Sequence, residues 1–79
     1  MAQPAALGER IRAAREKVGL SQGGLAVAIG SATGRQIVHD WESGRTEPGS
    51  RWVMPLCRAL GVTPEWLLEG AEPMTRQSR

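Results

Sequence analysis

Hydrophobic positions recur at helical spacing through most of the chain and predict five short helices. In residues 5–18, apolar side chains fall on one side at intervals of three or four, and charged side chains fill the other side. Four more segments with an apolar side follow, over residues 22–29, 34–43, 51–60 and 64–69. Because no segment has the alternation of a strand, the pattern predicts an all-α fold, a compact bundle of five helices.

Capping residues mark the ends of the first three helices. Gly19 and Gly44 follow the first and third segments, where a left-handed residue often ends a helix. Ser21 is a good N-cap for the second helix. Thr33 and Gln36 have the spacing of a capping box, with Thr33 as the N-cap of the third helix and Gln36 at its third position.

The fourth helix has a less regular sequence. Ser50 can cap it, but Pro55 falls inside it, so either its first turn is irregular or the helix begins near Met54. We expect Trp41, Trp52 and Trp66 in the core, and Trp66 as the one of the three best placed to touch a partner subunit.

The composition limits the kinds of site that this chain can build. Its 79 residues suffice for one domain, expected over residues 1–70, with 71–79 as a flexible polar tail. A single cysteine, Cys57, excludes an internal disulfide, and one cysteine with one histidine, His39, cannot form a four-ligand zinc site. We expect no cofactor, no metal and no enzymatic activity, since tyrosine is absent and a buried pocket has little room.

Hydropathy favours a soluble, intracellular protein, expected in the cytoplasm, and the charge permits an anionic partner. Ten basic and eight acidic residues give a net charge of +2, a mild basicity that permits nucleic-acid binding without demonstrating it. The longest strictly apolar run, residues 25–29, is far too short to span a membrane.

The second and third helices have the layout of a helix-turn-helix, expected over about residues 21–43. Ala26 and Gly30 are small enough for the close approach that this motif needs. The polar side of the third helix carries four residues near its N-terminus: Arg35, Gln36, His39 and Asp40. Any small helical bundle also has polar outer faces, so this pattern alone leaves both interpretations open.

Residues 7–70 resemble the phage repressor and Cro type of helix-turn-helix domain, the XRE family. The resemblance is carried, in the family's order, by residues 10–12, Gly-Leu-Ser-Gln at 19–22, Leu-Ala at 25–26, Ile-Gly at 29–30, Trp-Glu-Ser-Gly-Arg at 41–45, Pro48 and the segment 59–70. It implies a lambda repressor-like fold and a sequence-specific transcriptional regulator. The implied partner is a double-stranded DNA operator, bound as a homodimer in a bacterial cell or phage-infected host, with the helix over 34–43 in the major groove.

The register of the third helix is the one departure from the family pattern. About two extra residues lie between Gly30 and Trp41. The family pattern has a buried apolar residue three positions before the tryptophan. If the pattern is aligned from Trp41, this residue is Val38. If it is aligned from the Thr33 cap, the residue is Ile37. We favour Val38, which then lies one helical turn from Trp41.

In that register the resemblance assigns roles to individual residues. It implies base reading by Arg35, Gln36, His39 and Asp40, since Arg pairs with guanine, Gln with adenine, and Asp accepts from cytosine. The implied phosphate contacts come from six residues, Gln22, Gly23, Thr33, Ser43, Gly44 and Arg45, and from the N–H groups of the second helix's first turn. Arg15 and Glu42 stand where the family places a structural ion pair.

A protein-interaction module, such as an antitoxin or an adaptor on the same fold, is the alternative function. The acidic Asp40, the lengthened turn and a weak basic field favour it, because residues 31–51 hold three basic and three acidic side chains. This balance also predicts a shallow salt dependence of DNA binding.

Overall fold

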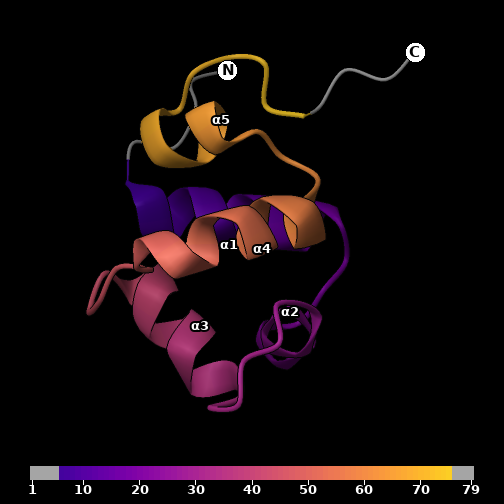
Figure 1. The fold of residues 1–79 in the computed structure, drawn as a ribbon, viewed down its shortest axis with the longest axis vertical. Coiled ribbons are helices and arrows are strands. Elements are labelled where there is room, and N and C mark those ends of the chain that lie inside the picture. Colours follow the sequence, from indigo (N-terminus) through magenta and orange to yellow (C-terminus); the bar gives the residue numbers. More distant parts are fainter. Residues whose placement is uncertain (1–5, 76–79) are drawn as a thin grey trace.

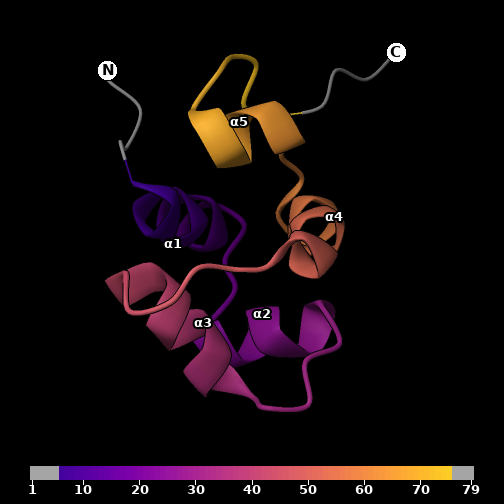
Figure 2. The ribbon, with the colours of Figure 1, turned by 60° about the vertical axis from the view of Figure 1, so that its left-hand side comes forward.

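Five helices form the computed structural model, which describes residues 6–75. In chain order they are α1 (Leu7–Lys17), α2 (Gln22–Ala28), α3 (Arg35–Ser43), α4 (Ser50–Leu60) and α5 (Pro64–Glu69). α2 and α3 lie at one end of the molecule, α5 lies at the other, and α1 and α4 lie between them (Figures 1 and 2). The predicted all-α class is confirmed: over residues 6–75 the β pairing is limited to an isolated bridge between Val62 and Thr75.

Every helix contributes to one hydrophobic core. Its buried members are Ile11, Ala14, Leu25, Ala26, Ile29, Val38, Trp41, Leu56, Cys57, Leu60, Val62, Trp66 and Leu67. Val38 is fully buried and Ile37 only partly, so the alignment counted back from Trp41 gives the correct register of α3. Burial also raises the pKa of the Cys57 thiol, which favours its protonated form.

The tryptophans pack inside the fold, which corrects one expectation. Trp66 has no exposed surface, so it is unavailable to the partner subunit that it was expected to touch. Trp41 is also buried, and its ring lies 5.9 Å from that of the partly buried Trp52. The guanidinium carbon of Arg51 lies over the Trp52 ring, 4.8 Å from the ring centroid.

The predicted capping box at the start of α3 is absent. The N-cap is Gly34, with φ +71°, and it makes no side-chain capping bond. Thr33 instead shares a 2.9 Å hydrogen bond with the hydroxyl of Ser31, and Gln36 donates to Asp40. The box is wrong because the helix begins later than Thr33 would require, and because the Gln36 side chain extends onward to Asp40 and not back to the Thr33 N–H.

α4 begins at Ser50 despite the proline within it. Its N-cap is Gly49, so Ser50 belongs to the helix and is not its cap. Of the two alternatives, a start near Met54 is wrong, and the first turn is irregular: the Trp52 N–H bonds to the Gly49 carbonyl three residues back. Pro55 lies inside the helix, which continues through it.

Both ends of α5 are tied to other parts of the chain. The buried Arg10 of α1 donates from Nε to the Leu67 carbonyl at 2.8 Å and from an Nη to the Leu68 carbonyl at 3.0 Å. These carbonyls lie in the last turn of α5, where helix geometry leaves them without partners. A buried arginine therefore closes the C-terminal end of this short helix.

The chain after α5 returns to the start of that helix. The Thr63 N–H bonds to the Met74 carbonyl at 2.9 Å, and the Thr63 hydroxyl donates to the Pro73 carbonyl at 2.9 Å. Met74 packs against the core, so residues 71–75 of the expected tail lie on the domain. Residues 76–79 lie outside the described part, and the flexibility of the tail stays a prediction.

None of the helices in residues 6–75 is long and apolar enough to cross a membrane.

α1 and α3 approach each other closely at Gly8. A Cβ built on Gly8 would overlap the backbone carbonyl oxygen of Trp41 and would lie 3.0 Å from that of Glu42. Backbone atoms cannot rotate away as a flexible side chain can, so glycine sets the spacing of these two helices.

Gly8→Ala is expected to lower the free energy of unfolding by about 1–3 kcal/mol, since the added methyl forces α1 away from α3. Gly49→Ala is the matched control, because a Cβ there meets no atom within 4 Å and its φ of −68° suits alanine. Urea unfolding of both variants measures the difference. Equal stability of the two would contradict a tight α1–α3 contact.

Candidate nucleic-acid interface

One face of α3 is free of the core and carries the four predicted base-reading residues. Arg35, Gln36 and His39 are exposed and Asp40 is half-buried. Positions i, i+1, i+4 and i+5 share one side of a helix, and Val38 and Trp41 lie buried on the other. The N-terminal end of α3 and the turn before it lie at the end of the molecule opposite α5 (Figure 1).

Two of these side chains are joined to each other. Nε2 of Gln36 donates a 2.9 Å hydrogen bond to Oδ1 of Asp40, one helical turn onward. The backbone carbonyl of Asp40 accepts from the Ser43 hydroxyl and from the N–H groups of Arg45 and Thr46. These three hydrogen bonds therefore hold the last turn of α3 and the loop after it to the carbonyl of Asp40.

A nearly buried ion pair connects α1 to α3. Nε and Nη2 of Arg15 donate to the two carboxylate oxygens of Glu42 at 2.6 and 3.0 Å, and the side chains are only 12% and 5% exposed. This is the pair that the resemblance implied. Bonding to Glu42 raises the pKa of Arg15, although burial opposes the rise.

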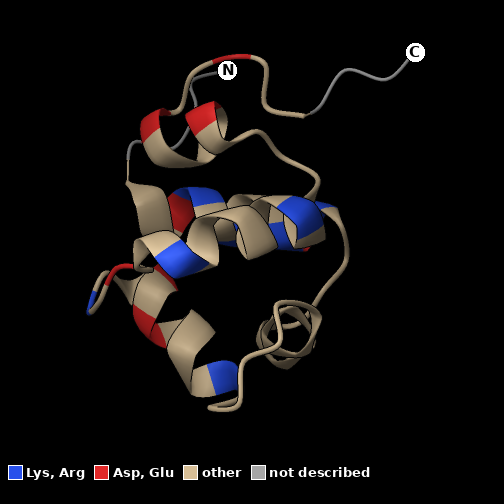
Figure 3. Cartoon of the chain, in the orientation of Figure 1, with Lys and Arg blue, Asp and Glu red and all other residues tan. Residues whose placement is uncertain are grey.

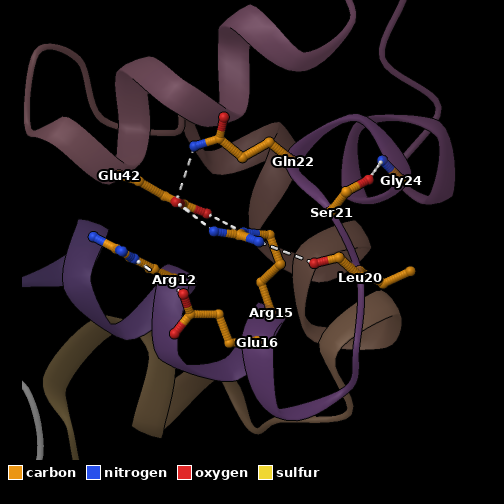
Figure 4. Close-up of polar contacts among 8 residues, drawn as sticks. All are labelled: Arg12, Arg15, Glu16, Leu20, Ser21, Gln22, Gly24 and Glu42. Carbon is orange, nitrogen blue, oxygen red and sulfur yellow. Dashed lines mark hydrogen bonds and ion pairs between the residues drawn. The ribbon is translucent and has the colours of Figure 1, made fainter.

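α2 joins the same network (Figure 4). Nε2 of Gln22 donates to the Glu42 carboxylate at 3.1 Å, and Nη1 of Arg15 donates to the Leu20 carbonyl at 2.9 Å. Ser21 caps α2 by accepting from the N–H of Gly24. The orientation of α2 relative to α3 is therefore fixed through Glu42.

A hollow of about 260 Å³ opens beside this network. It is lined by Arg12, Arg15, Gln22, His39, Glu42 and Ser43. His39 thus lies beside α1 and α2, next to two of the predicted phosphate-binding residues. Arg12 also lines the hollow, but the sequence did not predict it as a residue of this site. Its spacing of three from Arg15 places both arginines on one side of α1.

The other predicted phosphate-binding residues lie at the two ends of α3. Gly23 is near Arg35: a Cβ built on Gly23 would lie 3.9 Å from that of Arg35, an ordinary contact. Thr33 is exposed in the turn before α3. Gly44 ends the helix in the left-handed conformation, φ +82°, and Arg45 follows it, exposed.

The N–H groups at the start of α2 are not all available to a ligand, because that of Gly24 is bonded to Ser21.

Acidic side chains gather at the α5 end of the molecule, and the opposite end begins with an arginine. Glu65 and Glu69 lie on α5 and Glu72 follows it, whereas Arg35 stands at the N-terminus of α3 (Figure 3). The α3 end therefore has the more favourable potential for a polyanion. Across residues 6–75, no group of three His, Cys, Asp or Glu side chains is arranged to hold a metal ion.

A family model described as a helix-turn-helix domain matches residues 6–69 of the chain. The sequence is 36% identical over 64 residues to repressor protein C2 of Salmonella phage P22, covering 81% of this chain and 29% of that protein. It is 35% identical over 66 residues to the HTH-type transcriptional regulator DicA of Escherichia coli K12, covering 84% and 47%. The chain thus spans less than half the length of these curated relatives.

Two solved structures of the P22 c2 repressor share the fold. One is a crystal structure with a synthetic operator, which matches with a TM-score of 0.78 and 34% identity over 86% of this chain and all of that one. The other is the solution structure of its DNA-binding domain, with a TM-score of 0.76 and 34% identity over 89% and 88% of the two chains.

Glu42→Ala is expected to cost about 3 kcal/mol of folding free energy, because it leaves the Arg15 guanidinium nearly buried without its carboxylate. Glu16→Ala is the matched control: it removes a carboxylate from the exposed Arg12–Glu16 pair, for which a change within about 1 kcal/mol is expected. Chemical denaturation of both variants provides the comparison. A Glu42 variant as stable as the Glu16 variant would show that the ion pair does not hold α3 in place.

Proposed function

The chain belongs to the helix-turn-helix domain family, and from this we propose that it binds double-stranded DNA sequence-specifically and regulates transcription. The observation that carries the proposal is the exposed polar face of α3, which stands at one end of a fold that matches a repressor bound to an operator. In this arrangement α3 enters the major groove with its N-terminal residues against the base edges.

Each polar residue of that face suits a particular base edge. We propose that Arg35 binds the O6 and N7 atoms of a guanine and that Gln36 binds the N6 and N7 atoms of an adenine. Asp40 accepts a hydrogen bond from the amino group of a cytosine or an adenine, and His39 lies on the same side of the helix. Arginine gives the strongest single preference, since its fork matches guanine bidentately.

Two groups of residues flank α3 and would hold the DNA backbone. Gln22, Gly23 and Thr33 lie toward its N-terminal end, and Ser43, Gly44 and Arg45 follow its last turn. Polar side chains and backbone N–H groups in such positions bind phosphate and fix the register of the helix in the groove. Because acidic residues balance the basic ones near this face, we expect a shallow salt dependence of binding.

We also propose that two copies bind an operator with two-fold symmetry. Helix-turn-helix dimers place their recognition helices one DNA turn apart, about 34–36 Å, and read two half-sites. In this proposal the protein acts in the cytoplasm of a bacterial cell or of a phage-infected host. It works by occupying DNA and not by catalysis, as its similarity to a repressor and to a transcriptional regulator suggests.

Selection of bound duplexes from a random DNA pool tests the proposal. The wild type is expected to enrich a palindromic motif that contains a guanine in each half, and Arg35→Ala is expected to lose that guanine preference, worth about 1–3 kcal/mol. Arg58→Ala, an exposed arginine of α4, is the control for the loss of one charge and should leave the motif unchanged.

No enrichment by the wild type at moderate salt would refute DNA reading by this chain. A co-purifying protein partner that binds the Arg35 variant equally well would then support the protein-interaction alternative, which the acidic Asp40 on the same face favours.

A further inference from the structure

We propose that Asp40 is a positioning residue for Gln36, and that their hydrogen bond makes one base-pair position of the operator select adenine against guanine. The inference rests on the proposed function, DNA reading by α3. Its starting observation is the 2.9 Å bond from Nε2 of Gln36 to Oδ1 of Asp40, which joins two side chains on the exposed face of that helix.

Asp40 is the fixed member of the pair. Its side chain is short and half-buried, and its backbone carbonyl accepts three hydrogen bonds from residues 43, 45 and 46. Gln36 is exposed, with a longer side chain that has more rotatable bonds. The carboxylate therefore holds the amide, and the amide is directed with its nitrogen toward Asp40.

This orientation leaves Gln36 with a defined set of hydrogen-bonding atoms. An amide has two N–H donors on Nε2 and an acceptor, Oε1. With one N–H bonded to Asp40, one donor and the acceptor remain. Adenine presents N7 as an acceptor and its N6 amino group as a donor in the major groove, so one donor and one acceptor complement it.

Guanine does not match the same atoms. It presents two acceptors, N7 and O6, and the held amide offers only one free N–H, with Oε1 facing the second acceptor. A Gln36 released from Asp40 could rotate and donate both N–H groups to guanine. The carboxylate adds to the discrimination, because it repels the O6 acceptor that guanine has in place of the adenine amino group, and the O4 acceptor of thymine.

The experiment selects duplexes from one random pool with five proteins: the wild type, Gln36→Ala, Asp40→Ala, Asp40→Asn and the double variant Gln36→Ala/Asp40→Ala. Titrations of duplexes that differ at the one position relaxed by Gln36→Ala then give the adenine-to-guanine ratio of affinities. Asn is the conservative replacement, because its carbonyl oxygen still accepts from Gln36 while its charge is gone. The substitutions keep the Asp40 backbone carbonyl, and thermal unfolding checks that each variant stays folded.

We expect Gln36→Ala to reduce the adenine preference at one base pair about 5- to 150-fold. Asp40→Ala should reduce the adenine preference at the same base pair by at least about fivefold. The double variant should show the same adenine preference as Gln36→Ala alone. Asp40→Asn should retain the preference for adenine at the base pair that Gln36 reads, and should bind non-specific duplex more tightly, since a negative charge has left the DNA face.

Other results overturn the inference in distinguishable ways. A full adenine preference in Asp40→Ala, or no loss in Gln36→Ala, would refute positioning while leaving DNA reading by α3 intact. A loss in Asp40→Asn equal to that in Asp40→Ala would show that charge acts in place of the hydrogen bond. Absence of any enriched motif for the wild type would refute the proposed function and this inference together.

Discussion

The Arg15–Glu42 pair is the interaction on which the geometry of the helix-turn-helix depends. Two charges taken largely out of water are tolerated only when each is matched by close hydrogen bonds, and here both carboxylate oxygens are occupied. Gln22 bonds to the same carboxylate, and Arg15 also binds the carbonyl of Leu20. One polar cluster therefore sets how three helices meet, whereas the apolar core beneath it has no directional preference.

The spacing between α1 and α3 adds a second constraint on the same contact. Gly8 lets the backbone of α1 lie against the carbonyl oxygens of Trp41 and Glu42. Gly8 thus lies against the backbone of Glu42, whose side chain is held by Arg15, two turns further along α1. The close backbone contact at Gly8 thus restricts the distance of α3 from α1. The hydrogen-bonded ion pair restricts the orientation of α3.

Much of the fold follows from the sequence because its signals are local. Helical spacing of apolar residues predicted all five helices, and the one-turn distance from Trp41 identified Val38 as the buried residue of α3. The features that were missed depend on contacts between distant or competing groups. A capping box at Thr33 and a bond from Gln36 to Asp40 are both consistent with the sequence, and only the geometry of the turn decides between them. Burial of Arg10 against the last turn of α5 requires the packing of α1 on α5 to be known.

The separation of acidic and basic ends has a consequence for the rate of association. Within residues 6–75, the carboxylates around α5 and the arginine at the far tip of α3 contribute a dipole along the molecule, which Asp40 and Glu42 on α3 reduce, in addition to the small net charge of the chain. Near a polyanion that dipole exerts a torque, which turns the α3 end forward before the surfaces touch. The turning acts only within the Debye length, about 8 Å at physiological ionic strength. Added salt therefore lowers the fraction of encounters that arrive correctly oriented, even where few phosphates are finally bound.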